Sequence, residues 1–145
     1  MNKHPLTGVF LFGTLFMAQY SVLITSSPFQ GDSALRAYQF IQGVISNGDT
    51  VDNLFFYGDG VYHTNNLMLN TGDEFYGQDA WKRLSEQHEV KLLVCITAAV
   101  KRGIVSDQEA QEHGIAQANL SAPFIQAGLG EFFTELHNCD RLVQF

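Results

Sequence analysis

The stretch KLLVCITAAVKRG, residues 91–103, places Cys95 where an apolar run gives way to small residues and then to two cations. A cysteine reacts as its thiolate, and a helix N-terminus or a nearby cation favours that form. The residues after Cys95 predict a short helical turn whose backbone N–H groups would face the sulfur. Free cysteine is also among the most buried residue types and often only packs. The local pattern therefore leaves open whether Cys95 is a nucleophile or a core residue.

The two cations, Lys101 and Arg102, have three possible roles. They would tune the thiolate, contact a partner, or cap the carbonyl groups at the end of the turn. The second cysteine, Cys139, follows a predicted helix end, and packing is its simplest role. The sequence does not exclude a Cys95–Cys139 disulfide, although a reducing cytosol disfavours one.

Other polar motifs are weaker candidates. GDGVYHTNN, which contains His63, is typical of a polar turn. Asp73 and Glu74 are adjacent, so their side chains diverge, and we expect both to face solvent. The glycines form no nucleotide-binding pattern. The five histidines and two cysteines lack the spacing of a zinc site. We therefore expect neither a metal nor another cofactor.

The elements that would position Cys95 alternate along the chain. Apolar, β-branched runs predict strands, and periodic segments between them predict helices. The expected strands are residues 20–25, 51–57, 90–96 and 141–145. The expected helices are residues 32–46, 78–88, 106–113 and 129–139, with 118–128 ambiguous.

This alternation predicts a single α/β domain with a largely parallel sheet of about five strands and helices on both faces. Such folds build their sites from the loops at the carboxyl ends of the strands. The expected convergence is among residues 26–32, residues 57–66 and the turn after Cys95.

Composition narrows the class of partner. The 145 residues suffice for one domain with a core, and the formal net charge is −7. Lysine and arginine are scattered, so direct nucleic-acid binding is not expected. Proteins or small molecules are the expected partners.

Residues 1–16 are interpreted as an upstream or non-native extension, with the domain spanning 17–145. Residues 5–31 carry no formal charge, and part of this run mimics a membrane span or signal peptide. Gln19 and Ser21 interrupt the run, and no signal-cleavage motif closes it. A membrane anchor and a structural extension remain the alternatives to the interpretation of residues 1–16.

Taken together, the motifs resemble the sulfur-relay D subunits of the DsrE-like sulfurtransferase family. The matching pieces, in order, are FFYGDGVYHTNN, VCITAAVKRGI, GLGEF and CDRLVQF. The resemblance covers roughly residues 17–145 and implies a DsrE-like fold. It also implies that Cys95 carries the transferred sulfur as a persulfide, and that Cys139 does not.

The resemblance further implies a cytoplasmic heterohexamer with TusB-like and TusC-like subunits, arranged as a dimer of trimers. That complex would accept sulfane sulfur from a TusA-like carrier and relay it to a TusE-like acceptor, for 2-thiouridine formation at the tRNA wobble position. Each transfer is an exchange of the thiol–disulfide type. The alternatives are a DsrE-type subunit of a sulfur-oxidation DsrEFH complex, a non-catalytic interaction subunit, and a flavodoxin-like cofactor binder.

Overall fold

The computed structural model describes residues 17–145, and the interpretation of residues 1–16 lies outside them. The described residues form one five-stranded sheet in the order β4-β3-β2-β1-β5, and every pairing is parallel. The predicted single α/β domain with a parallel sheet is confirmed. The strands are β1 (Gln19–Ile24), β2 (Thr50–Phe56), β3 (Lys91–Cys95), β4 (Phe124–Ala127) and β5 (Arg141–Gln144).

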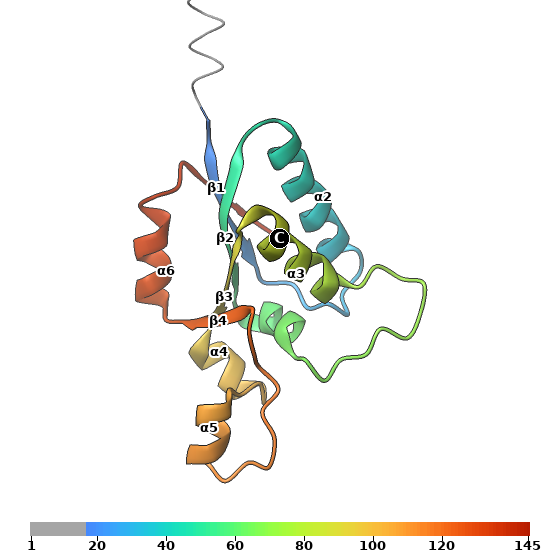
Figure 1. Cartoon of the computed structure of the whole chain (residues 1–145), viewed down its shortest axis with the longest axis vertical. Helices are drawn as coiled ribbons and strands as arrows, with labels where there is room; N and C mark the ends of the chain where they lie inside the picture. The colour runs from blue at the N-terminus through green and yellow to red at the C-terminus, as the bar shows by residue number, and fades with distance from the viewer. Residues whose placement is uncertain (1–16) are drawn as a thin grey trace, which may run out of the picture.

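Helices cover both faces of this sheet, as expected. Figure 1 shows α2 and α3 together on one side and α6 on the other, with α4 and α5 beyond the end of β3. No helix in residues 17–145 has the length and apolar character needed to cross a membrane. The helices are α2 (Ser33–Ser46), α3 (Gly77–His88), α4 (Ile96–Lys101), α5 (Asp107–Glu112) and α6 (Leu129–Leu136).

Aromatic contacts fix each helical layer to the sheet. On the α3 side, Phe56 of β2 meets Trp81 edge to face, with ring centroids 6.0 Å apart. On the α6 side, Phe55 stacks on Phe132 at 4.2 Å. Neighbouring strand residues point to opposite faces, so β2 carries one aromatic anchor for each layer.

Capping residues mark the ends of several helices. The capping box of Ser106 and Glu109 starts α5. Asn47 caps α2, and Gly48 follows it with φ of 87°. The ambiguous segment 118–128 contains β4, a short edge strand beside β3. Its exposed Ile125 had obscured the pattern of a buried strand.

The expectation that residues 58–66 form only a polar turn is wrong. Gly58–Thr64 is the 3-10 helix η1, and Gly60, Val61, His63 and Thr64 are buried in it. An added Cβ at Gly60 would collide with the backbone carbonyl of Ile24, so only glycine permits η1 to pack this closely on β1. The polar composition of residues 58–66 therefore did not indicate that η1 is packed against the sheet.

The apolar residues of α6 do not form one buried face. Phe132 is buried, whereas Leu129 and Phe133 are 44% and 56% exposed. Leu129 and Phe133 lie four positions apart and therefore share a different stripe of the helix. That stripe faces solvent in this chain.

Candidate functional site

Cys95 ends β3 and is the N-cap residue of α4, with φ of −63° and ψ of 117°. The strand places it at the carboxyl edge of the sheet, opposite Ala127 of β4. Its side chain is a free thiol in a residue that is only 4% exposed. The predicted position at a strand-to-helix junction is confirmed.

The expected helical turn follows Cys95 directly, but its N–H groups make no hydrogen bond with the sulfur. Within the described residues, the Cys95 side chain accepts no capping hydrogen bond from α4. Sulfur is a weak acceptor compared with the oxygens that usually cap helices. The N–H groups of α4 therefore do not act on this thiol through a capping hydrogen bond.

A pocket of about 580 Å³ opens beside Cys95. Its walls come from the carboxyl ends of three neighbouring strands: Tyr57 and Gly58 follow β2, Cys95 ends β3 and is followed by α4, and Gly128 follows β4. We call this the Cys95 pocket. Its remaining lining residues are Thr97, Ala98, Lys101, Arg102 and Leu129.

The expected set of converging loops is therefore right in two members and wrong in the third. The loop of residues 26–32 follows β1, which β2 separates from β3. The turn after β4, with Gly128 and Leu129, takes its place. The sequence did not predict which loops converge because it did not give the strand order. Residues 118–128, which contain the strand next to Cys95, had an ambiguous pattern.

The loop after β1 instead borders a second hollow of about 650 Å³, which residues 68–78 enclose from the other side. Asp73 and Glu74 line this hollow and are exposed, as expected. The hollow is larger than the Cys95 pocket but contains no cysteine. Of the two, the smaller pocket is the one that a cysteine lines.

Arg102 has two fixed partners at the end of α4. Its Nε donates to Asp59 Oδ1 at 3.0 Å, and its Nη1 donates to the carbonyl oxygen of Ala98 at 3.0 Å. The bond to Ala98 matches capping, one of the three expected roles. The bond to Asp59 also ties α4 to η1.

Cys139 lies at the opposite edge of the sheet from Cys95. It follows α6, and the next residue, Asp140, donates its backbone N–H to Gln19 at the start of β1. Cys95 instead ends β3, so the strands separate the two thiols. Both cysteines are free, and the disulfide left open by the sequence is absent.

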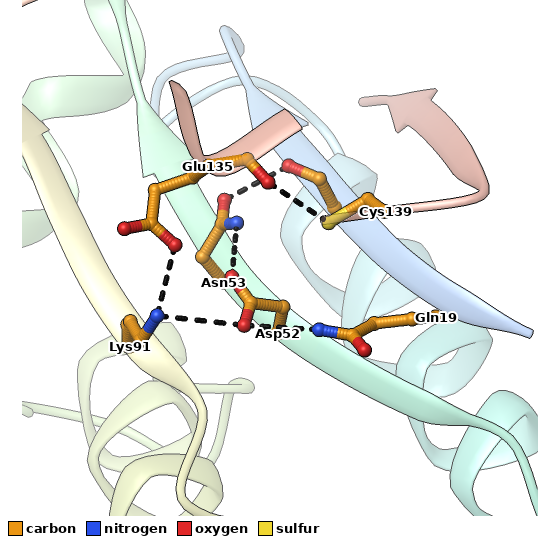
Figure 2. Close-up of polar contacts among 7 residues, drawn as sticks. Gln19, Asp52, Asn53, Lys91, Glu135 and Cys139 are labelled. Carbon is orange, nitrogen blue, oxygen red and sulfur yellow. Dashed lines mark hydrogen bonds and ion pairs between the residues drawn. The ribbon is translucent and has the colours of Figure 1, made fainter. Parts of the chain in front are cut away.

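Cys139 lies at one end of a polar network (Figure 2). Its Sγ donates to the carbonyl oxygen of Glu135 at 3.5 Å, while the Glu135 carboxylate accepts from Lys91 at 2.8 Å. Lys91 also reaches Asp52, which lies where the β1–β2 register shifts. Burial, together with the charges of Asp52 and Glu135, raises the pKa of Cys139 to about 11. Cys139 is therefore a poor thiolate source.

His63, considered only as part of a turn, is 1% exposed. Its Nε2 donates to the carbonyl oxygen of Ser26 at 3.0 Å, and Trp81 lies against the other ring nitrogen. His63 borders the larger hollow and is absent from the walls of the Cys95 pocket. It is a structural histidine rather than a partner base for the thiol.

A metal centre has no counterpart in residues 17–145. No group of three or more histidine, cysteine, aspartate or glutamate side chains gathers there in a way that could hold an ion. Buried side-chain nitrogen and oxygen atoms in the same residues all have hydrogen-bond partners. The polar side chains that line the Cys95 pocket are the Cys95 thiol, the hydroxyl-bearing Tyr57 and Thr97, and the cations Lys101 and Arg102.

These features define a parallel α/β domain with a pocketed cysteine at a strand end. The model of the DsrE/DsrF-like family matches residues 18–145, and the chain belongs to this family. The expected family is confirmed.

Named relatives match most of the chain. This chain is 43% identical over 126 residues to a protein of Vibrio parahaemolyticus named "Sulfurtransferase TusD homolog". The match covers 87% of this chain and 96% of that protein. The chain is 39% identical over 129 residues to "Sulfurtransferase TusD" of Serratia proteamaculans, covering 89% and 100%. The crystal structure of the ychN protein from E. coli shares the fold, with a TM-score of 0.66 at 15% identity over 89% of this chain and all of that one.

Proposed function

We propose that this chain is a sulfurtransferase subunit in which Cys95 carries sulfur as a persulfide. One observation supports this most directly: a free cysteine ends β3 beside a pocket, in a chain similar over most of its length to proteins named as TusD sulfurtransferases. The similarity supports sulfur transfer in general. The donor, the acceptor and the final product are further parts of the proposal.

The transfer needs few groups. The Cys95 thiolate attacks the outer sulfur of a donor persulfide, R–S–SH. A bond forms between Cys95 Sγ and that sulfur, the donor S–S bond breaks, and its electron pair leaves on the donor thiolate. The product is Cys95–S–SH. An acceptor thiolate then attacks the outer sulfur and releases the Cys95 thiolate, so the site is restored.

We further propose the partners that the family resemblance implies. TusB-like and TusC-like subunits would complete a cytoplasmic heterohexamer, with a TusA-like protein as donor and a TusE-like protein as acceptor. The sulfur would end in 2-thiouridine at the tRNA wobble position. The net charge of −7 supports a chain that meets proteins and leaves tRNA to another component.

The low exposure of Cys95 favours one competing function, that of a non-catalytic interaction subunit. The Cys95 pocket supports the carrier function instead, because it gives a donor group a route to the residue. A DsrE-type subunit of a sulfur-oxidation complex would use the same thiol chemistry. Loss of thiolated tRNA on deletion of the gene would support the tRNA relay over sulfur oxidation.

Isotopic sulfur tests the carrier function. The assembled complex is incubated with a donor bearing labelled persulfide, and the label is mapped by mass spectrometry of peptides kept unreduced. We expect label on Cys95 and none on Cys139. Label on other residues of an active complex, with Cys95 unlabelled, would overturn the proposal.

A further inference from the structure

The two cations of the Cys95 pocket are not equivalent. Arg102 is held by Asp59 and by the carbonyl of Ala98. Asp59 belongs to η1, whose neighbouring Gly60 is packed against the backbone of β1. The guanidinium charge is therefore compensated by a carboxylate on a well-anchored element.

Lys101 has no such compensation. It is exposed, and no carboxylate in residues 17–145 forms an ion pair with it. It is the last residue of α4 and lies four positions after Thr97, so the two share one face of the helix. Side chains on a helix incline toward its N-terminus. Lys101, Thr97 and Cys95 all line the same pocket.

The local charge balance follows from these contacts. The Asp59–Arg102 pair is close to neutral, and the ammonium of Lys101 remains as a positive charge in the lining of the Cys95 pocket. The chain as a whole is acidic, with a formal net charge of −7. A single free cation in such a setting makes the pocket locally attractive to anions.

We infer that Lys101 is the residue that attracts anionic sulfur to Cys95 and stabilises its negative charge during transfer. This inference deepens the proposed function and rests on it. Charge leaves Cys95 Sγ when the sulfur attacks, and it appears on the donor thiolate when the donor S–S bond breaks. The Lys101 ammonium contacts the substrate sulfur inside the pocket and transfers no proton. Arg102 positions α4 and makes no contact with the substrate.

Two alkylating reagents of similar size isolate this charge effect from the relay itself. Iodoacetate is an anion and iodoacetamide is neutral, and both react with a thiolate. The full chain carrying Cys139→Ser leaves Cys95 as its one thiol, and the two alkylation rates are measured by mass spectrometry. The rate ratio of iodoacetate to iodoacetamide reports the field at Cys95.

Replacement of Lys101 should change that ratio. We expect Lys101→Gln to lower it on the order of fivefold at low salt, since one partly solvated charge acts over a few ångströms. High salt should shrink the difference between the variant and its parent. Lys101→Arg should restore the ratio. Lys82→Gln, on α3 and away from the pocket, should leave it unchanged.

The outcomes separate the two proposals. If Lys101→Gln leaves the ratio unchanged while labelled sulfur still reaches Cys95, the inference about Lys101 is overturned and the proposed function stands. If Cys95 reacts with neither reagent and takes up no label, both are overturned. A lowered ratio that Lys101→Arg restores supports the inference.

Discussion

The indole Nε1 of Trp81 lies 3.4 Å from Nδ1 of His63 in the core. An indole nitrogen can only donate, so Nδ1 must accept. The other ring nitrogen, Nε2, faces the carbonyl oxygen of Ser26, which can only accept. Together the two contacts require a neutral imidazole with its proton on Nε2. A second proton on the ring would turn the Trp81 contact into two opposed donors.

The stability of the protein should therefore fall in mild acid. Burial lowers the pKa of His63 from 6.5 to about 4, and the bond to Ser26 offsets this only in part. Between these values the unfolded chain binds a proton that the folded protein does not. The free energy of unfolding is expected to drop by up to about 3 kcal/mol as the pH falls from 6.5 to 4. Urea unfolding at a series of pH values measures this.

A matched pair of variants assigns the effect. His63→Gln should be less stable at pH 7 but should lose much of the slope between pH 6.5 and 4. His113→Gln replaces an exposed histidine and should keep the slope. Equal slopes in His63→Gln and the parent would contradict the assignment.

The burial of His63 also shows which part of the fold the sequence could not predict. Period and composition predicted strands β1, β2, β3 and β5, because each is a short apolar run bounded by turn residues. They could not predict η1, because its burial depends on the contact of Gly60 with a strand that lies far away in the chain. The only local signal of η1 was a polar composition within a few residues of the end of a buried strand.

The candidate site around Cys95 was predictable from the sequence to about the same extent as the fold. Cys95 was located correctly at the end of a strand, since that placement depends on residues beside it in sequence. The partners of Arg102 and the contribution of Gly128 depend on the strand order. Strand order depends on pairing between residues that lie far apart in the chain. No local sequence pattern specifies that pairing.

Gly60 and Gly43 should respond to alanine in opposite directions. Gly60→Ala introduces a Cβ into the backbone of Ile24, so η1 must shift, and we expect a loss of about 2 kcal/mol or more. Gly43 is exposed inside α2 and has no atom within reach of an added Cβ. Gly43→Ala should stabilise the protein by about 0.5–1 kcal/mol. Thermal unfolding of both variants is the measurement, and a neutral Gly60→Ala would contradict the packing argument.

Phe132 should account for most of the anchoring of α6. Its ring stacks on Phe55, with an interplanar angle of 8°, and it is 4% exposed. Phe132→Ala should cost about 3–5 kcal/mol. The neighbouring Phe133 is 56% exposed, so Phe133→Ala should cost less than about 1 kcal/mol in the isolated chain. Comparable losses in chemical denaturation would show that α6 is anchored differently.

Cys139 should react slowly with alkylating reagents at neutral pH. Its pKa is raised to about 11 from an ordinary value of 9.0, which lowers the thiolate fraction roughly a hundredfold. In a Cys95→Ser background, the rate of iodoacetamide labelling should therefore rise steeply through pH 9 and level off only near 11. A plateau by pH 9 would show that burial and the nearby carboxylates do not control this thiol.

The last prediction separates the fold from the chemistry at Cys95. Cys95 is the N-cap of α4 and has an extended backbone, which is the conformation that serine adopts as a preferred cap. Cys95→Ser should therefore fold with thermal stability close to that of the parent, because a hydroxyl at this position can accept from the first turn of α4. It should carry no labelled sulfur, because an alkoxide does not form at neutral pH and no persulfide can be built on oxygen.

Cys139→Ser is the matched control, since it removes the other thiol at the opposite edge of the sheet. It should retain sulfur transfer. If Cys139→Ser abolishes labelling of Cys95 while the protein stays folded, the relay uses both cysteines and the assignment of Cys95 as the one carrier in this chain is wrong. Transfer that persists in Cys95→Ser would mean that the complex passes sulfur through another thiol.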